Sequence, residues 1–165
     1  MKQPLILLTA LMACAGAYAN TTSINGTVES KCIITTDTNG VYGNPSGEAL
    51  STKPTDGGVT PIVRYDIVTA DAYVAKITYP DSFSSSPSLT DTVTWTGGTE
   101  AGQMSDSTMS AFNTSKVEYN NTTEFDLSVA GSVWFEVTSE AEYGYEKAFP
   151  AGNYSAVVTA ECIAQ

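Results

Sequence analysis

Histidine, the side chain that most often serves as a general base or metal ligand, does not occur in this sequence of 165 residues. Its absence excludes Ser-His-Asp and Cys-His nucleophilic sites, as well as zinc and haem centres held by histidine. The 18 acidic residues could supply the carboxylate pair of a glycoside hydrolase, but no spacing singles out two of them. We therefore expect a protein that is not an enzyme and that uses no cofactor.

One stretch late in the chain concentrates carboxylates and aromatic rings, the groups that bind calcium or stack on sugars. Its members are Glu136, Glu140, Glu142, Tyr143, Tyr145 and Glu146. A solvated acidic loop is the simpler interpretation, and no metal site is predicted. Trp95 and Trp134 are likewise interpreted as core and half-exposed strand residues rather than as a platform for a ligand.

The charge balance limits the partners of the protein. Seven basic residues against 18 acidic ones give a formal net charge of −11, and the lysines are scattered along the chain. Because a phosphate backbone is bound by clustered lysine and arginine, nucleic acid is not expected as a partner.

The N-terminal residues have the features of an export signal. Lys2 supplies a positive charge, residues 4–13 are almost entirely apolar, and Ala17-Tyr18-Ala19 forms the small-x-small pattern that precedes cleavage. We therefore expect a signal peptide over residues 1–19 and a single mature domain over residues 20–165. The mature protein would be exported to the periplasm, to the cell surface or to the medium.

A second interpretation of the same segment is a lipoprotein signal, with lipid attached to Cys14. Met12 suits such a signal poorly, so ordinary cleavage is favoured. The apolar run is too short to span a bilayer, and no later segment approaches the roughly 20 apolar residues of a spanning helix. No transmembrane segment is expected.

Removal of the signal leaves Cys32 and Cys162 as the only cysteines of the mature chain. In an exported protein a lone pair of cysteines usually forms a disulfide. The two lie 130 positions apart, and bridged cysteines require Cα atoms within about 7 Å. The first and last segments are therefore predicted to be neighbours in space.

The segments that must position these residues alternate apolar and polar side chains with a period of two, which is typical of half-buried β-strands. The alternating runs are residues 24–34, 63–67, 73–79, 93–96, 117–119, 125–129, 133–137 and 154–163. Clusters of Gly, Pro, Asn and Ser separate them and indicate turns. This pattern predicts an all-β fold, a single antiparallel β-sandwich.

Two segments carry additional expectations. Residues 97–114 are rich in Ser, Thr and Gly, and are predicted to form a long loop or an irregular edge. The last run, residues 154–163, has apolar side chains on both faces around Val157 and Val158, which predicts a central or covered strand.

Two short motifs lie near the ends of the mature chain. Ile24-Asn25-Gly26-Thr27-Val28 is an apolar-x-Gly-x-Val segment, and Cys32-Ile33-Ile34 follows it. Pro150-Ala151-Gly152-Asn153 leads into the run that begins with Tyr154. These motifs resemble the first and last strands of chaperone-usher pilus subunits and of the spore coat protein U branch.

The resemblance implies an incomplete immunoglobulin-like sandwich whose groove accepts a donor strand from another subunit. It also implies that the partners are other copies or pilus subunits, with a periplasmic chaperone and an usher. The candidate donor or first-strand residues are Ile24, Gly26 and Val28. The candidate last-strand motif comprises Gly152, Tyr154 and Val158.

The chain departs from the family pattern in three ways. The family disulfide usually joins the first strand to the second, whereas Cys162 lies in the predicted last strand. The C-terminus lacks the penultimate aromatic residue that chaperones often recognise, and only residues 20–23 precede the first motif. Either residues 21–30 are themselves the donor, or the protein is a self-completed sandwich or a terminal subunit.

The residues and the resemblance together lead to one expected function and one alternative. We expect an exported, non-catalytic structural or adhesive protein resembling fimbrial subunits, which assembles by β-strand exchange if its groove is open. The alternative is a monomeric extracellular module that binds carbohydrate or calcium.

Overall fold

The computed structural model describes residues 23–27, 31–68 and 72–165. The predicted signal peptide with Cys14, and Val28 of the first motif, lie outside these described residues. The strands are β1 (Cys32–Thr38), β2 (Gly43–Ser46), β3 (Ala49–Ser51), β4 (Ile62–Ile67), β5 (Tyr73–Thr78), β6 (Val93–Met104), β7 (Val117–Tyr119), β8 (Thr122–Leu127), β9 (Gly131–Tyr143) and β10 (Thr159–Ala164). The short helices are η1 (Pro54–Asp56), η2 (Ser107–Ala111) and α1 (Phe112–Ser115).

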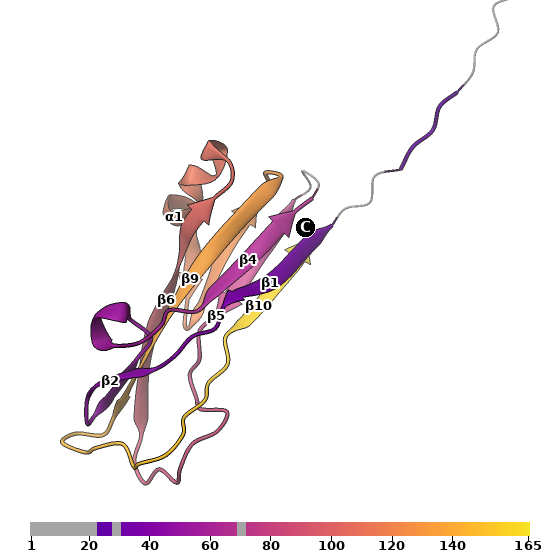
Figure 1. The fold of residues 1–165 in the computed structure, drawn as a ribbon. Helices are drawn as coiled ribbons and strands as arrows, with labels where there is room; N and C mark the ends of the chain where they lie inside the picture. The colour runs from indigo at the N-terminus through magenta and orange to yellow at the C-terminus, as the bar shows by residue number, and fades with distance from the viewer. Residues whose placement is uncertain (1–22, 28–30, 69–71) are drawn as a thin grey trace, which may run out of the picture.

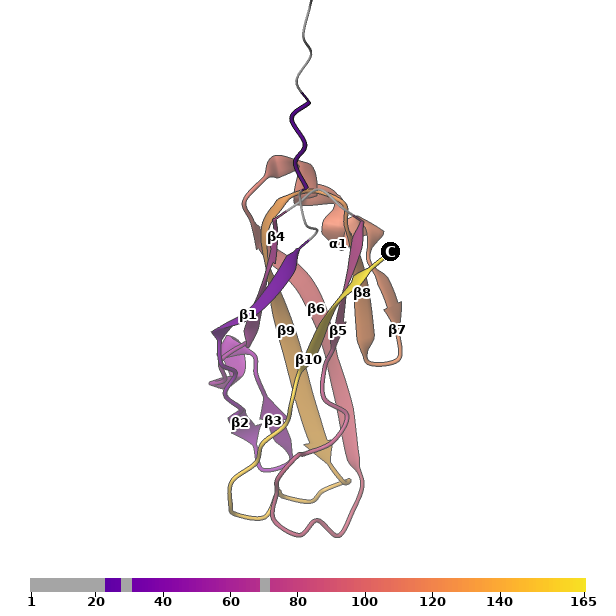
Figure 2. The ribbon, with the colours of Figure 1, turned by 90° about the vertical axis from the view of Figure 1, so that its right-hand side faces the viewer.

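These strands form two antiparallel sheets that pack face to face (Figures 1 and 2). In the larger sheet the strand order is β1-β4-β9-β3-β2, and β6 pairs with the other edge of β9. The smaller sheet has the order β10-β5-β8-β7. The predicted all-β sandwich is therefore confirmed.

The alternation read from the sequence places one set of side chains between the sheets. The buried members from the larger sheet include Val63, Tyr65, Ile67, Val133, Phe135 and Val137, and those from the smaller sheet include Tyr73, Ala75, Ile77, Phe125 and Leu127. Phe135 lies at the centre, with its ring centroid 5.4 Å from that of Tyr65 and 4.3 Å from that of Phe125. Burial of this apolar surface is the main stabilising contribution to the fold.

Strand order relates the sandwich to the immunoglobulin fold. The run β1-β4-β9-β6 follows the A-B-E-D order of that fold, and β10-β5 follows its F-C order. The remaining strand of a seven-stranded immunoglobulin domain, strand G, would pair with the free edge of β10. Among the described residues no strand occupies that place.

The predicted disulfide is confirmed and joins the two sheets. Cys32 begins β1 in the larger sheet, Cys162 lies near the end of β10 in the smaller one, and their Cα atoms are 6.4 Å apart. Tyr65 adds a hydrogen bond between the sheets, because its hydroxyl donates to the Glu161 carbonyl at 3.0 Å. The first and last strands therefore lie side by side at the level of these residues, on the side of the molecule turned to the viewer in Figure 2.

For residues 97–104 the structure corrects the expected long loop and confirms the alternative, an irregular edge: among the described strands this part of β6 pairs with β9 alone, and its register shifts between Ala101 and Gln103. β6 continues through Gly97 to Met104, paired with β9, and only then do η2 and α1 cross to the smaller sheet. Gly97 has a packing role, because a Cβ at this position would lie 2.9 Å from the ring of Tyr79. This run of small residues is thus the continuation of a strand, with a glycine where a neighbouring ring comes close.

The expected last strand is also corrected. β10 begins at Thr159 rather than at residue 154, because its partner β5 ends at Thr78, the residue opposite Thr159. β10 is an edge strand, not a central or covered one, and Val157 just before it is 62% exposed. In the described part of the chain no helix has the length and hydropathy needed to cross a membrane.

Candidate functional site

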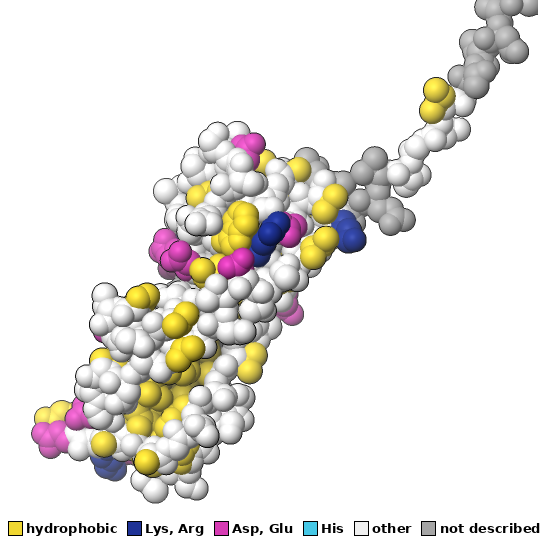
Figure 3. Space-filling model, in the orientation of Figure 1, with side chains coloured by type: hydrophobic (Ala, Val, Ile, Leu, Met, Phe, Trp, Pro, Cys, Tyr) yellow, Lys and Arg dark blue, Asp and Glu magenta, His cyan; other side chains and the backbone are white. Residues whose placement is uncertain are grey.

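A groove of about 600 Å³ opens between the segment that follows β1 and the segment that precedes β10. Thr36 and residues 38–42 form one wall, and residues 152–158 form the other. Leu50, Thr52, Val63 and Ser139 lie between these walls. Figure 3 shows hydrophobic side chains exposed along a hollow in the lower half of the molecule.

The groove opens because the first and last segments leave their sheets below the disulfide. The pairing of β1 with β4 shifts between Thr36 and Thr38, after which the chain turns towards an isolated bridge between Val41 and Val59. On the other wall β10 has not yet begun. The disulfide therefore closes the side of the sandwich at one end only, and the two walls separate beyond it.

One wall presents unpaired backbone. Within the described chain, the N–H and C=O groups of Ala156, Val157 and Val158 make no backbone hydrogen bond, although Ser155 pairs with Ser85 in both directions. Their side chains alternate as in a strand, with Ala156 and Val158 half-buried and Val157 exposed. Such a row of free N–H and C=O groups is the edge to which another strand can bind.

The polar groups on the floor of the groove are already satisfied. The hydroxyls of Tyr42 and Ser139 are 2.9 Å apart, and the Ser139 N–H donates to the hydroxyl of Thr52 at 2.9 Å. Burial raises the pKa of Tyr42, although its hydrogen bond to Ser139 lowers it in part. None of the described residues that line the groove carries a charge. The groove thus offers apolar contact and backbone pairing rather than a reactive group.

An aromatic cluster supports the wall that precedes β10. Phe83 lies at its centre, with ring centroids 4.6 Å from Trp95, 5.1 Å from Tyr154 and 6.0 Å from Phe149. Tyr154 is further fixed by a hydrogen bond from its hydroxyl to the Pro150 carbonyl at 2.6 Å. These edge-to-face contacts hold in place a segment that has little sheet pairing of its own.

The structure places the predicted site residues in three locations. Gly152, Tyr154 and Val158 all line the groove, although they precede β10 rather than belong to it. Cys32 and Cys162 lie beyond its closed end. Ile24 and Gly26 are exposed, Ile24 at 96%, and they form no strand, so they are not part of the body's first strand. Val28 falls outside the described residues.

Sequence reasoning missed most of the other wall and its support. Asn39 and Gly40 belong to one of the clusters that indicate turns, and nothing in the sequence links Tyr42 or Phe83 to the last segment. The signal that could have found them is the concentration of aromatic residues in segments predicted to be loops.

The acidic and aromatic stretch does not converge on a site. Glu136, Glu140 and Glu142 lie on β9 rather than in the expected loop, and Glu140 forms an ion pair with Lys53 at 2.5 Å. Tyr143 is buried, with its hydroxyl accepting a hydrogen bond from the Thr90 N–H at 2.9 Å. The structure as described contains no group of three or more acidic or cysteine side chains placed to hold a metal ion.

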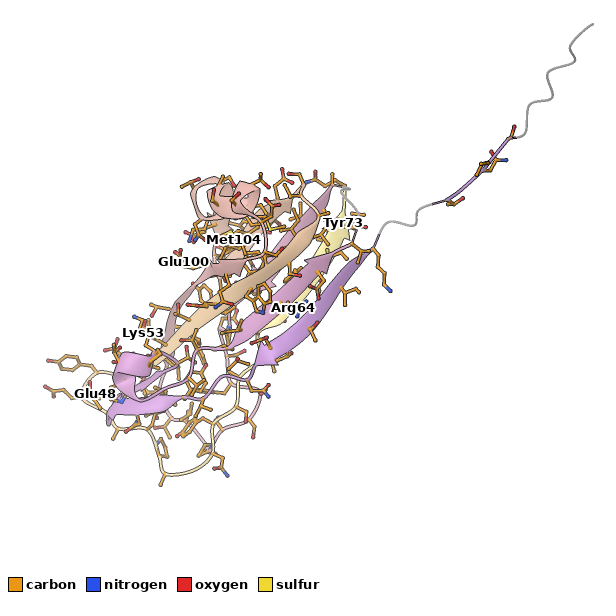
Figure 4. All side chains as sticks on the ribbon, turned by 45° about the horizontal axis from the view of Figure 1, so that its top comes forward. Glu48, Lys53, Arg64, Tyr73, Glu100 and Met104 are labelled. Atoms are coloured by element: carbon orange, nitrogen blue, oxygen red, sulfur yellow. A yellow bond between two sulfur atoms is a disulfide. The ribbon has the colours of Figure 1, made fainter. Side chains whose placement is uncertain are left out.

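Trp134 lies on the outer face of the larger sheet, and its ring is covered. The guanidinium of Arg64, labelled in Figure 4, lies 4.9 Å from the ring centroid, and the indole N–H donates to Asp37 at 3.2 Å. Arg64 also pairs with Asp66 at 2.7 Å. Burial opposes ionisation of Asp66, but hydrogen bonds from Ser132 and Arg64 outweigh it and lower the pKa.

The tryptophan faces are thus in contact with neighbouring residues of the same chain, Trp134 with Arg64 and Trp95 with Phe83.

Comparisons of the chain with protein-family models, with curated proteins and with solved structures find no match. The groove between residues 36–42 and 152–158 is the candidate functional site.

Proposed function

We propose that this chain is an exported, non-catalytic structural or adhesive subunit, resembling fimbrial subunits, that assembles by β-strand exchange. The observation that carries the proposal is the open groove with an unpaired backbone edge at Ala156, Val157 and Val158. This is the side of the sandwich on which strand G of an immunoglobulin domain would lie. A strand inserted there would complete the sheet and pair with the free N–H and C=O groups of residues 156–158.

The occupant that we propose for the groove is the N-terminal segment of another copy, centred on residues 23–27. This segment is exposed, and Ile24 and Gly26 alternate with polar residues, as a strand with one apolar face requires. Residues 20–28 carry no charge, and neither does the described lining of the groove. In a chain of net charge −11 this match favours the segment over a charged ligand.

The size of the groove also suits such a donor. Residues 36–42 correspond to about 20 Å of extended chain at about 3.3 Å per residue. A donor of six or seven residues would span it, with alternate side chains directed at the floor. Backbone pairing would then supply affinity, and the small and apolar side chains would supply register.

A peptide that copies residues 21–30 tests the proposal. The full chain, produced in an oxidising compartment, is melted with and without excess peptide. Peptide at one hundred times its Kd would stabilise the fold by about 2.7 kcal/mol. The matched control peptide carries aspartate in place of Ile24 and Val28, and should leave the melting temperature unchanged.

The size distribution of the protein is measured in the same samples, because a groove already filled by another copy would not bind peptide. Polymers, or a melting shift specific to the native peptide, would support strand exchange. Neither a shift nor a polymer would refute it. Stabilisation by calcium, or retention on a glycan array, would instead favour a monomeric binding module.

The partners of such a subunit follow from the same proposal. A chain with an open edge needs that edge protected before assembly, which is the role of a periplasmic chaperone, and an usher would then order the subunits. Genes for a chaperone and an usher next to the gene for this chain would support this assignment.

A further inference from the structure

We propose that the Cys32–Cys162 disulfide prevents the N-terminal segment from filling the groove of its own chain, and so directs that segment to another copy. The inference rests on the proposed function, because it concerns which donor the groove accepts. It gives the disulfide a role in partner choice in addition to its role in stability.

Only a short stretch of chain connects the N-terminal segment to the groove of its own copy. Residues 23–27 precede Cys32 by a few residues, and the groove begins four residues beyond Cys32, at Thr36. To enter its own groove, the segment would have to reverse direction and run back along the free edge of β1. That path passes between β1 and β10 at the level of the disulfide.

There is no room for a strand at that level. Neighbouring strands lie about 4.8 Å apart, so a strand inserted between two others needs about 9.6 Å between them. The Cα atoms of Cys32 and Cys162 are only 6.4 Å apart, and a covalent bond holds them there. The antiparallel return alongside β1 is therefore blocked at its first residue.

A detour over the solvent side of the disulfide fills the groove with the wrong residues. The groove spans roughly 13–33 Å beyond Cys32 along an extended chain, and Ile24 can reach at most about 24 Å beyond Lys31. Val28, three residues before Lys31, cannot reach the groove at all. Most of the length of the groove would then face residues 20–23 (Asn-Thr-Thr-Ser), which have no apolar side chain to bury in it.

A segment from another copy meets neither obstacle. It can enter the groove from the open side without passing the disulfide, and it can place Ile24 and Gly26 anywhere along the floor. The resulting contact is heterologous, because one copy gives its N-terminal segment and the next gives its groove. Repetition of this contact produces an open chain of copies.

Photo-cross-linking with isotope labels tests the inference directly. Full-length protein carrying Ile24→benzoylphenylalanine is prepared in ordinary and ¹⁵N-labelled forms. Equal amounts are unfolded together without reductant, refolded together and irradiated. Mass spectrometry then identifies cross-links from position 24 to residues 152–158, and shows whether the two peptides carry the same label or different labels.

The expected result is that half of the cross-linked pairs combine one labelled and one unlabelled peptide, as random pairing between copies requires. Cross-links to the groove that join only peptides of the same label would overturn the inference while leaving the proposed function intact. Cross-links that avoid the groove altogether would refute the proposed function, and with it the inference.

Two variants then separate the two obstacles to self-filling, the disulfide and the short connection between the segment and Cys32. In the double variant Cys32→Ala with Cys162→Ala, the direct return path is open and Ile24 can reach the start of the groove near Thr36, so same-label cross-links should rise above half. A second variant keeps the disulfide and adds ten Gly and Ser residues directly before Cys32. This extension lets Ile24 reach the whole groove by the outer path, so same-label pairs should again exceed half. A label ratio that changes with the extension but not with loss of the disulfide would overturn the inference, because the short connection alone would then explain the choice of donor. A ratio unchanged in both variants would overturn it as well.

Discussion

The aromatic cluster around Phe83 makes a quantitative prediction about the wall of the groove. Replacing a fully buried phenylalanine by alanine costs about 3–5 kcal/mol. Phe83 is half-buried and packs against Trp95, Tyr154 and Phe149, so we expect Phe83→Ala to cost about half as much, ~2 kcal/mol. For a domain of this size that corresponds to a fall in Tm of about 4–8 °C.

The assay uses tryptophan fluorescence, because the chain contains two tryptophans and they report on different regions. In a Trp134→Phe background, Trp95 is the only reporter and lies next to Phe83. Urea unfolding gives the loss of stability, and the emission of Trp95 in the folded state should shift to longer wavelength as its ring becomes exposed. Binding of the peptide that copies residues 21–30 should weaken, because Tyr154 loses its neighbour.

Two control variants separate a local effect from a general one. Phe83→Leu keeps most of the apolar contact and removes the edge-to-face geometry, so it should cost about 1 kcal/mol. Phe125→Ala, in the core between the sheets, should cost the full 3–5 kcal/mol without shifting Trp95 emission in the folded state. A cost below about 0.5 kcal/mol for Phe83→Ala, with unchanged emission, would refute the assigned role.

Three further substitutions have expected outcomes. Tyr65→Phe removes the hydrogen bond to the Glu161 carbonyl and should lower the free energy of unfolding in urea by about 1 kcal/mol. A variant as stable as the wild type would contradict a stabilising role for this hydrogen bond. Asp66→Asn should lower stability at pH 7. The folded-state pKa of Asp66 lies below its ordinary value of 3.8, so its contribution is fully present above that pH and is lost as the pH falls through the folded value. Melting curves of the two proteins should therefore converge in acid, and a constant difference would exclude the linkage. Gly152→Ala would place a Cβ 2.5 Å from Cγ of Pro87 and should cost about 1–3 kcal/mol and weaken peptide binding; unchanged melting and binding would show that the wall can shift freely.

The sequence predicts the strands in which every second side chain is buried between the two sheets. Val63, Tyr65 and Ile67 alternate with polar residues because one face of β4 meets the core and the other meets water. The disulfide was predictable because Cys32 and Cys162 are the only pair left after the expected cleavage. Both signals are local or depend on simple counting.

The candidate site could be predicted only in part, because its shape depends on where pairing stops. The apolar run around Val157 and Val158 indicates a strand with two covered faces, yet β5 ends at Thr78 and leaves these residues without a paired strand among the described residues. No periodicity in residues 154–163 shows where a neighbouring strand ends. Likewise, the contacts of Phe83 with Phe149 and Tyr154 join segments that are far apart in the chain.

The absence of charge along the groove has a consequence for how ionic strength would act on assembly. Two bodies of net charge −11 repel each other on approach, and salt screens that repulsion over a Debye length of about 8 Å at physiological concentration. Contacts within the groove are neutral, so salt hardly affects how long a seated strand remains. Salt would therefore raise the association rate constant and leave the dissociation rate constant nearly unchanged. At low salt, repulsion between the acidic surfaces would slow association.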